Sequence, residues 1–92
     1  MTQTDSIESV ADRLAALYGA EFGGKPKGRY RVSTKLVQSL WGRKRLYEDD
    51  IDALTRAMFE RGFILVSLEG FLVVLGANAF VNYRRVNEEA IL

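Results

Sequence analysis

The chain has 92 residues, of which 48% are hydrophobic and 27% are charged, and its formal net charge at pH 7 is +1. This length predicts one small domain, 1–92, and the composition is that of a folded protein rather than a disordered one. Cysteine and histidine are both absent, which excludes disulfides, the usual zinc sites and Ser-His-Asp triads. We therefore expect a binding protein that is not an enzyme and carries no cofactor.

Positive charge is concentrated in one segment of the chain. Residues 23–46 contain eight Lys or Arg and no Asp or Glu, whereas residues 1–22 and 47–62 each carry a net charge of −3. The net charge of the whole chain hides this asymmetry, which indicates a polyanionic or acidic partner.

The N-terminal part of the sequence predicts a helix followed by a loop. Asp5 and Ser6 are followed by Glu8, three residues after Asp5, which resembles a capping box. Apolar residues then recur at steps of three and four, and the helix is expected to end near Gly19 to Gly23. Residues 23–29 contain three glycines and a proline, which predicts a flexible basic loop.

A short strand and a second helix follow the loop. Residues 29–32 alternate in polarity, as a strand does. Ser33 or Thr34 is then expected to cap a helix that ends at Gly42. The apolar face of this helix is predicted to consist of Leu36, Val37, Leu40 and Trp41.

The second half of the sequence predicts a longer helix and a hairpin. Residues 48–61 carry an apolar stripe, and residues 63–68 and 71–75 are apolar strands joined by a tight turn at Glu69-Gly70. Asn78 is expected to cap a final short helix. The inward residues of that helix would be Phe80, Tyr83, Val86 and Ala90 or Ile91.

The apolar stretch 63–81 is not predicted to cross a membrane. Glu69 and Gly70 lie near its middle, where a spanning helix tolerates them least. The N-terminus lacks the basic and apolar regions of a signal peptide. We expect a cytoplasmic protein with a flexible N-terminus at 1–5 and a frayed C-terminus at 87–92.

From Ser6 to Leu75 the chain resembles the winged-helix variant of the helix-turn-helix family. Residues 33–42 match the first helix of the motif, residues 48–62 match the second, and FILVSL-EG-FLVVL matches the wing. The resemblance rests on the order of elements and assigns no subfamily. It implies an α+β fold in which three helices pack on a two- or three-stranded antiparallel hairpin, followed by a short C-terminal helix. It also implies binding to double-stranded DNA, transcriptional regulation and formation of a homodimer.

The basic segment supplies the candidate nucleic-acid contacts. Phosphate binding requires several Lys or Arg on one connected surface, because each contact releases condensed counterions. In a winged helix, the start of the first motif helix and the turn after it lie against the backbone of the nucleic acid. The candidate residues are Lys25, Lys27, Arg29, Tyr30, Arg31, Ser33, Thr34, Lys35, Arg43, Lys44 and Arg45.

Two features argue against base reading by the helix at 48–61. Its first turns contain Glu48, Asp49, Asp50 and Asp52, which phosphates repel and which are better explained as partners of the helix dipole. The predicted wing tip, Glu69-Gly70, is also acidic where a groove-probing wing usually carries Arg or Lys.

The aromatic residues divide into core and surface candidates. Tyr30 lies between Arg29 and Arg31 and is the best candidate for stacking on a base. Trp41 falls on an apolar helix face and is expected in the core. Phe59 lies off the apolar stripe of its helix and is expected to be exposed, as at a protein contact.

Two functions remain open from the sequence. The first is a nucleic-acid-binding protein, with DNA favoured over RNA. The second is a protein-interaction module whose basic face docks an acidic partner or blocks another protein's nucleic-acid site. Asp49 and Asp52 share a helix face, but no third ligand accompanies them, so we expect no metal site.

Overall fold

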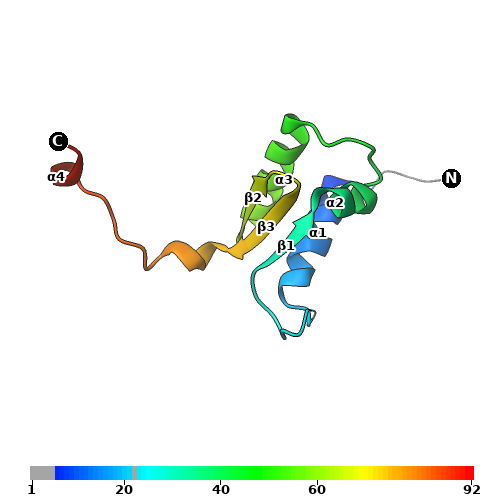
Figure 1. The fold of residues 1–92 in the computed structure, drawn as a ribbon, viewed down its shortest axis with the longest axis horizontal. Coiled ribbons are helices and arrows are strands. Elements are labelled where there is room, and N and C mark those ends of the chain that lie inside the picture. Colours follow the sequence, from blue (N-terminus) through cyan, green and yellow to red (C-terminus); the bar gives the residue numbers. More distant parts are fainter. Residues whose placement is uncertain (1–5, 22) are drawn as a thin grey trace.

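The chain folds as an α+β domain. The computed structural model describes residues 6–21 and 23–92, so the predictions for residues 1–5 lie outside the described residues. The elements in chain order are α1 (Ile7–Tyr18), β1 (Tyr30–Ser33), α2 (Thr34–Trp41), α3 (Glu48–Glu60), β2 (Phe63–Leu68), β3 (Phe71–Gly76), the 3₁₀ helix η1 (Ala77–Phe80) and α4 (Glu88–Ile91) (Figure 1). The predicted α+β class is confirmed.

Serine side chains cap two of the helices. Ser6 Oγ accepts a hydrogen bond from the Ser9 N–H at the start of α1, and Ser33 Oγ accepts one from the Leu36 N–H at the start of α2, both at 3.1 Å. The cap of α2 is therefore Ser33. Gly42 ends α2 at a φ of 77°, a left-handed conformation that glycine adopts without strain.

The three strands form one antiparallel sheet in the order β1-β3-β2. Tyr30 of β1 lies opposite Val74 of β3, and Val74 lies opposite Leu65 of β2. These three side chains point to the same face, because side chains at directly opposed positions of a sheet do so. The turn between β2 and β3 contains Gly70 at a φ of 84°, and the predicted hairpin is confirmed.

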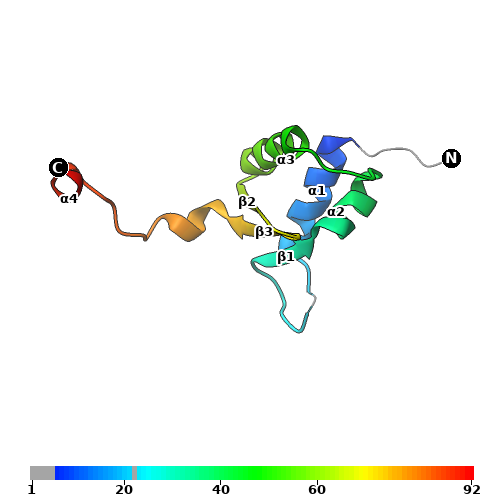
Figure 2. The same cartoon turned by 45° about the horizontal axis from the view of Figure 1, so that its top comes forward.

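The core lies between one face of this sheet and the helices α1, α2 and α3, which lie on that same face (Figure 2). It is formed by the apolar stripes of the helices and by alternate residues of the strands. Its buried members are Val10, Ala11, Leu14, Tyr30, Val37, Trp41, Leu54, Ala57, Met58, Leu65, Leu72 and Val74. The prediction that Trp41 belongs to the core is confirmed.

An ionic contact joins α1 to the end of α3, and it was not predicted from the sequence. Arg61 Nε donates to Asp12 at 2.8 Å, and Arg61 Nη2 donates to Glu8 at 2.6 Å. The same guanidinium donates to the Ala57 carbonyl. The hydrogen bonds to Glu8 and then to Asp12 raise the pKa of Arg61 above its ordinary value. The acids of the N-terminal helix thus contact an arginine of the same chain.

The prediction of a final helix packed inward is wrong. The 3₁₀ helix η1 follows β3 directly, an irregular stretch follows it, and α4 spans four residues capped by Asn87 rather than Asn78. Tyr83, Val86 and Ile91 are 65%, 70% and 77% exposed. The apolar residues of this C-terminal segment do not enter the core, because α1, α2 and α3 already cover the inner face of the sheet.

Tyr30 connects β1 to α1 through a buried hydrogen bond. Its hydroxyl donates to the Leu14 carbonyl at 2.5 Å, and its side chain is 8% exposed. We expect Tyr30→Phe to lower the free energy of unfolding by about 1–2 kcal/mol, because the Leu14 carbonyl loses a buried partner. Urea denaturation monitored by circular dichroism measures the change.

The same substitution has a predicted pH dependence. Burial raises the pKa of Tyr30 above its ordinary value of 10.0. The folded state then keeps a proton that the unfolded state loses, so this contribution is present below about pH 10 and is lost as the pH rises further. We expect the stability of the parent to fall more steeply above about pH 10 than that of Tyr30→Phe. Parallel curves for the two proteins would contradict this.

Candidate nucleic-acid interface

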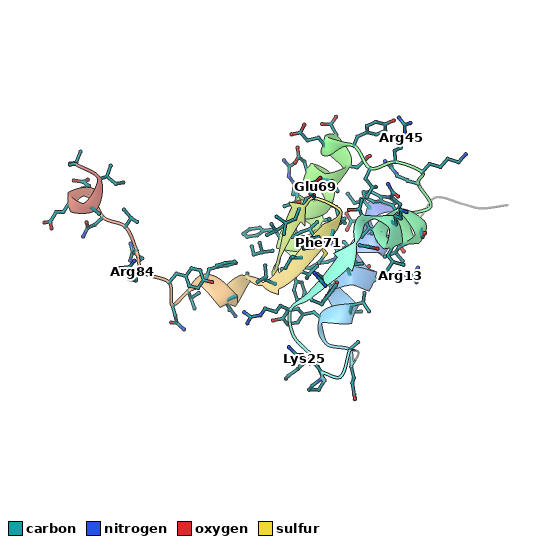
Figure 3. The ribbon with its side chains drawn as sticks, in the orientation of Figure 1. Arg13, Lys25, Arg45, Glu69, Phe71 and Arg84 are labelled. Carbon is teal, nitrogen blue, oxygen red and sulfur yellow. The ribbon has the colours of Figure 1, made fainter. Side chains whose placement is uncertain are left out.

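All eight cations of the basic segment are exposed, but the fold divides them into two groups. Figure 3 shows Lys25 and Arg45 at opposite ends of the domain, with β1 and α2 between them. We call Lys25, Lys27, Arg29 and Arg31 the loop cluster. We call Lys35, Arg43, Lys44 and Arg45 the α2 cluster.

The loop cluster lines a shallow groove beside β1. Lys25, Lys27, Arg29 and Arg31 all border this groove, together with glycines of the loop. Three loop glycines have positive φ values, and the Gly28 N–H donates to the Tyr18 carbonyl at 2.9 Å. That hydrogen bond holds the return of the loop against the end of α1, so the cations project from a defined path.

Tyr30 also borders that groove, but its ring exposes little surface for stacking. Strand alternation places Arg31 outward and turns the ring of Tyr30 into the core, where it is 8% exposed. The buried ring also packs in the core cluster, and its hydroxyl donates to the Leu14 carbonyl. Its predicted role in stacking is therefore corrected to a structural one, and the charged neighbours in the sequence were a misleading signal.

The α2 cluster lies at the two ends of α2, with Lys35 in its first turn and Arg43, Lys44 and Arg45 after its C-cap Gly42. Lys35, Gln38, Ser39, Gly42, Arg43 and Lys44 border a second shallow groove that contains no carboxylate. The helical repeat places Lys35, Gln38, Ser39 and Gly42 on the same face, because they are three, four and seven residues apart, and Arg43 and Lys44 follow directly after Gly42. Gln38 and Ser39 were not predicted from the sequence, although their spacing of three and four residues from Lys35 indicates that they share its helix face. Arg45 lies farther along the same connection between α2 and α3.

The predicted contacts Ser33 and Thr34 lie at the start of α2. Ser33 Oγ already accepts the Leu36 N–H, so its main role is to cap the helix. Thr34 is the first residue of α2 and precedes Lys35 directly. The N-terminal amides of a helix favour anions, and here they lie beside a lysine with no acid in the first turn.

Arg43 is the member of the α2 cluster with the most contacts inside the protein. Its guanidinium lies 4.7 Å from the ring centroid of Trp41 and donates to the carboxylate of Asp50. Asp50 also accepts the Tyr47 N–H at 2.9 Å. The pKa of Asp50 is lowered first by that backbone hydrogen bond and then, against some desolvation, by Arg43. Arg43 and Asp50 together hold the connection between α2 and α3.

The exposed face of α3 is acidic. Glu48, Asp49, Asp52 and Glu60 are all exposed there, and Asp50 alone of the first-turn acids makes the contacts described above. Phe59 is 63% exposed on the same helix, which confirms its predicted exposure. Glu69 lies exposed at the tip of the β2–β3 hairpin (Figure 3). The surfaces that would read bases in a winged helix therefore carry negative charge.

Comparison with protein-family models, with curated proteins and with solved structures finds no match to this chain. Among the helices of residues 6–21 and 23–92, none has the length and apolar character needed to span a membrane. The described residues also contain no group of three or more His, Cys, Asp or Glu side chains placed to hold a metal ion.

The Asp50 contacts predict a difference at acid pH. A lowered pKa means that the charged carboxylate stabilises the folded state above its ordinary pKa of 3.8 and that this contribution is lost as the pH falls. We expect Asp50→Asn to be less stable than the parent at pH 7 and the difference to shrink below about pH 4. Asp49→Asn, with the same change in charge at an exposed position, is the control. A difference that is constant with pH would contradict the assignment.

Proposed function

We propose that this chain is a small nucleic-acid-binding protein of the winged-helix type that grips the phosphates of double-stranded DNA. The observation that carries the proposal is the α2 cluster. Three cations and two neutral polar side chains line one groove without a carboxylate, at a helix whose N-terminal amides favour anions. The order of elements from α1 to β3 supports the winged-helix family.

The dimensions of α2 suit a phosphate backbone. Eight helical residues span about 12 Å, and phosphates follow one another about every 3.4 Å of axis along one strand of a duplex. Lys35 at the first turn and Lys44 beyond the last turn therefore reach over about three phosphates. Gln38 and Ser39, between them, supply neutral hydrogen-bond donors of the kind that fix register on DNA.

The loop cluster extends this grip at the other end of β1. Lys25, Lys27 and Arg29 lie on a loop. A duplex bound to α2 either passes along this loop, or the loop closes on the second strand of the duplex. Neither cluster belongs to α3, whose exposed acids disfavour insertion into a groove. The proposed binding is consequently independent of sequence to a large degree, and it suits an accessory role in transcription regulation in the cytoplasm.

A protein-interaction module on the same fold is the second candidate. The observation that favours it is the exposed surface of α3, which carries Phe59 near one end and the acids Glu48, Asp49 and Asp52 near the other. Exposed aromatic side chains of this kind are typical of protein contacts. In this alternative the two basic clusters dock an acidic partner instead of a nucleic acid.

The first test removes charge from the α2 cluster. We expect Lys35→Gln, Lys44→Gln and Arg45→Gln together to weaken duplex binding at least tenfold. The slope of log K against log salt should fall by about 2–3, because each lost phosphate contact removes about 0.9. Arg43 is left intact because it also holds Asp50. Fluorescence anisotropy at several salt concentrations measures both quantities.

The matched control changes the net charge equally at other positions. Arg56→Gln, Arg84→Gln and Arg85→Gln lie on α3 and in the C-terminal segment. Equal weakening by both triple variants shows that net charge alone acts and contradicts the α2 assignment. If the parent does not bind duplex at low salt, the proposal fails and the protein-interaction module takes its place.

A second test concerns α3. Glu48→Gln, Asp49→Asn and Asp52→Asn together remove three negative charges from its exposed first turns. If α3 does not read bases, binding becomes tighter by about threefold or more on all duplexes alike, because repulsion of phosphates is removed. If α3 accepts hydrogen bonds from base edges, the variant loses affinity for preferred sequences. Competition between duplexes of different sequence distinguishes the two results.

A further inference from the structure

The outer face of the sheet is apolar across two strands. Side chains of β2 and β3 that point away from the helices form three directly opposed pairs in the register. These pairs are Ile64–Leu75, Val66–Val73 and Leu68–Phe71. Val66 and Leu68 are 37% and 48% exposed, and the other four side chains are half-buried. In the described part of the chain, α1, α2 and α3 all contact the opposite face, so this one is uncovered.

Such a face is unusual for an isolated sheet. Antiparallel sheets with one solvated side alternate apolar and polar residues, whereas nearly continuous apolar strands are typical of sheets that are covered on both sides. Here FILVSL and FLVVL are nearly continuous. Large contiguous apolar patches on soluble proteins mark contact sites. The pattern of β2 and β3 therefore predicts a second layer.

A second apolar surface of the same chain is also uncovered. We call residues 77–92 the arm. It leaves the end of β3 and projects away from the helices and the sheet, which gives the molecule a longest dimension of 58 Å against 32 and 23 Å (Figures 1 and 2). Its exposed large apolar residues are Phe80, Val81, Tyr83, Val86, Ile91 and Leu92.

We infer that the arm of one copy covers the outer sheet face of a second copy, so that two chains exchange arms in a twofold dimer. Two uncovered apolar surfaces in one chain satisfy each other in such an arrangement, because each copy supplies one of each. The inference concerns a face and an arm that the α2 cluster does not use, and of the loop cluster only Arg31 borders this face.

The start of the arm favours a second copy over the arm's own sheet. The Ala77 N–H donates to the Gly62 carbonyl at 2.9 Å, and η1 then continues off the end of β3. Phe80 packs edge-on against Tyr83, with ring centroids 5.2 Å apart. This first turn directs the following residues away from the domain and its sheet (Figure 1).

The size of the two surfaces suits a stable dimer. A specific interface uses roughly 20–30 residues on each partner. Each copy supplies the sixteen residues of the arm and seven of the face, which are the six apolar side chains and Arg31. Three aromatic rings, those of Phe71, Phe80 and Tyr83, lie among them, and aromatic residues are enriched in interface cores.

The charges of the two surfaces are also complementary. The arm carries Arg84-Arg85 followed by Glu88-Glu89. The outer face is bordered by Arg31, whose guanidinium lies 5.6 Å from the centre of the Phe71 ring, and by Glu69 at the hairpin tip. The arm thus carries residues of opposite sign both for Arg31 and for Glu69 of the partner's face.

The first experiment measures mass in solution without nucleic acid. Size-exclusion chromatography with light scattering should give twice the chain mass for the parent. Val66→Asp on the face and Tyr83→Asp on the arm should each raise the dissociation constant at least tenfold. Leu36→Asp is the matched control, because Leu36 is an apolar residue of α2 that is 62% exposed and lies outside both surfaces. Circular dichroism verifies that each variant is folded. A monomeric parent at 100 μM, or equal effects of all three substitutions, overturns the inference.

The second experiment identifies the occupant of the face. The chain has no cysteine, so Val66→Cys and Tyr83→Cys introduce thiols with no background. A short bismaleimide added to a mixture of the two single variants should join one of each into a covalent dimer. In the double variant, a cyclised monomer at high dilution shows that the arm folds onto its own sheet and overturns the inference. Absence of both products shows that another molecule covers the face, which overturns it as well. Because no nucleic acid is present, these outcomes are separate from those of the binding assays.

Discussion

Burial of one face of the β1-β3-β2 sheet under α1, α2 and α3 is the constraint on which the rest of this structure depends. A chain of this length has one core, and that core uses Leu65, Leu72 and Val74 from the sheet together with the apolar stripes of the helices. Strand alternation then determines what remains outside. Arg31 faces outward while Tyr30 points inward. The outward-facing apolar side chains of β2 and β3 are left without a covering layer.

The same packing separates the charges of the chain. Contact of α1 with α3 brings Glu8 and Asp12 to Arg61, so part of the acidic N-terminal region is used within the fold. The connection between α2 and α3 is held by Arg43 and Asp50, which leaves the other cations of the α2 cluster with their charge directed to solvent. Most of the remaining acids of the described residues lie on α3 and at the hairpin tip, whereas Glu21 follows α1 and Glu88 and Glu89 lie in the arm. The α2 cluster and the acidic α3 together suit contact with the phosphate backbone of a nucleic acid and are poorly suited to contact with base edges.

Local signals in the sequence were sufficient wherever a short segment controls its own geometry. The helix start at Ser33, the helix end at Gly42 and the turn at Glu69-Gly70 each depend on residues within about four positions of one another. The helix end and the turn were predicted, and the start was predicted at Ser33 or Thr34. The exposure of Phe59 and the burial of Trp41 followed from helical periodicity. The α2 cluster was predicted in part, since its cations were named while Gln38 and Ser39 were not.

The sequence alone established the elements from α1 to β3, the α+β class and the concentration of cations between positions 23 and 46, but not the arrangement of the C-terminal segment. The division of those cations into two clusters came from folding, because β1 and α2 carry the loop at 23–29 and the turn after Gly42 to opposite ends of the domain. Folding likewise moved Tyr30 into the core and directed the arm outward. Periodicity reports which face of an element is apolar, whereas the partner of that face depends on long-range packing. A continuous apolar strand and an apolar C-terminal segment look alike in sequence whether they are buried in one chain or between two.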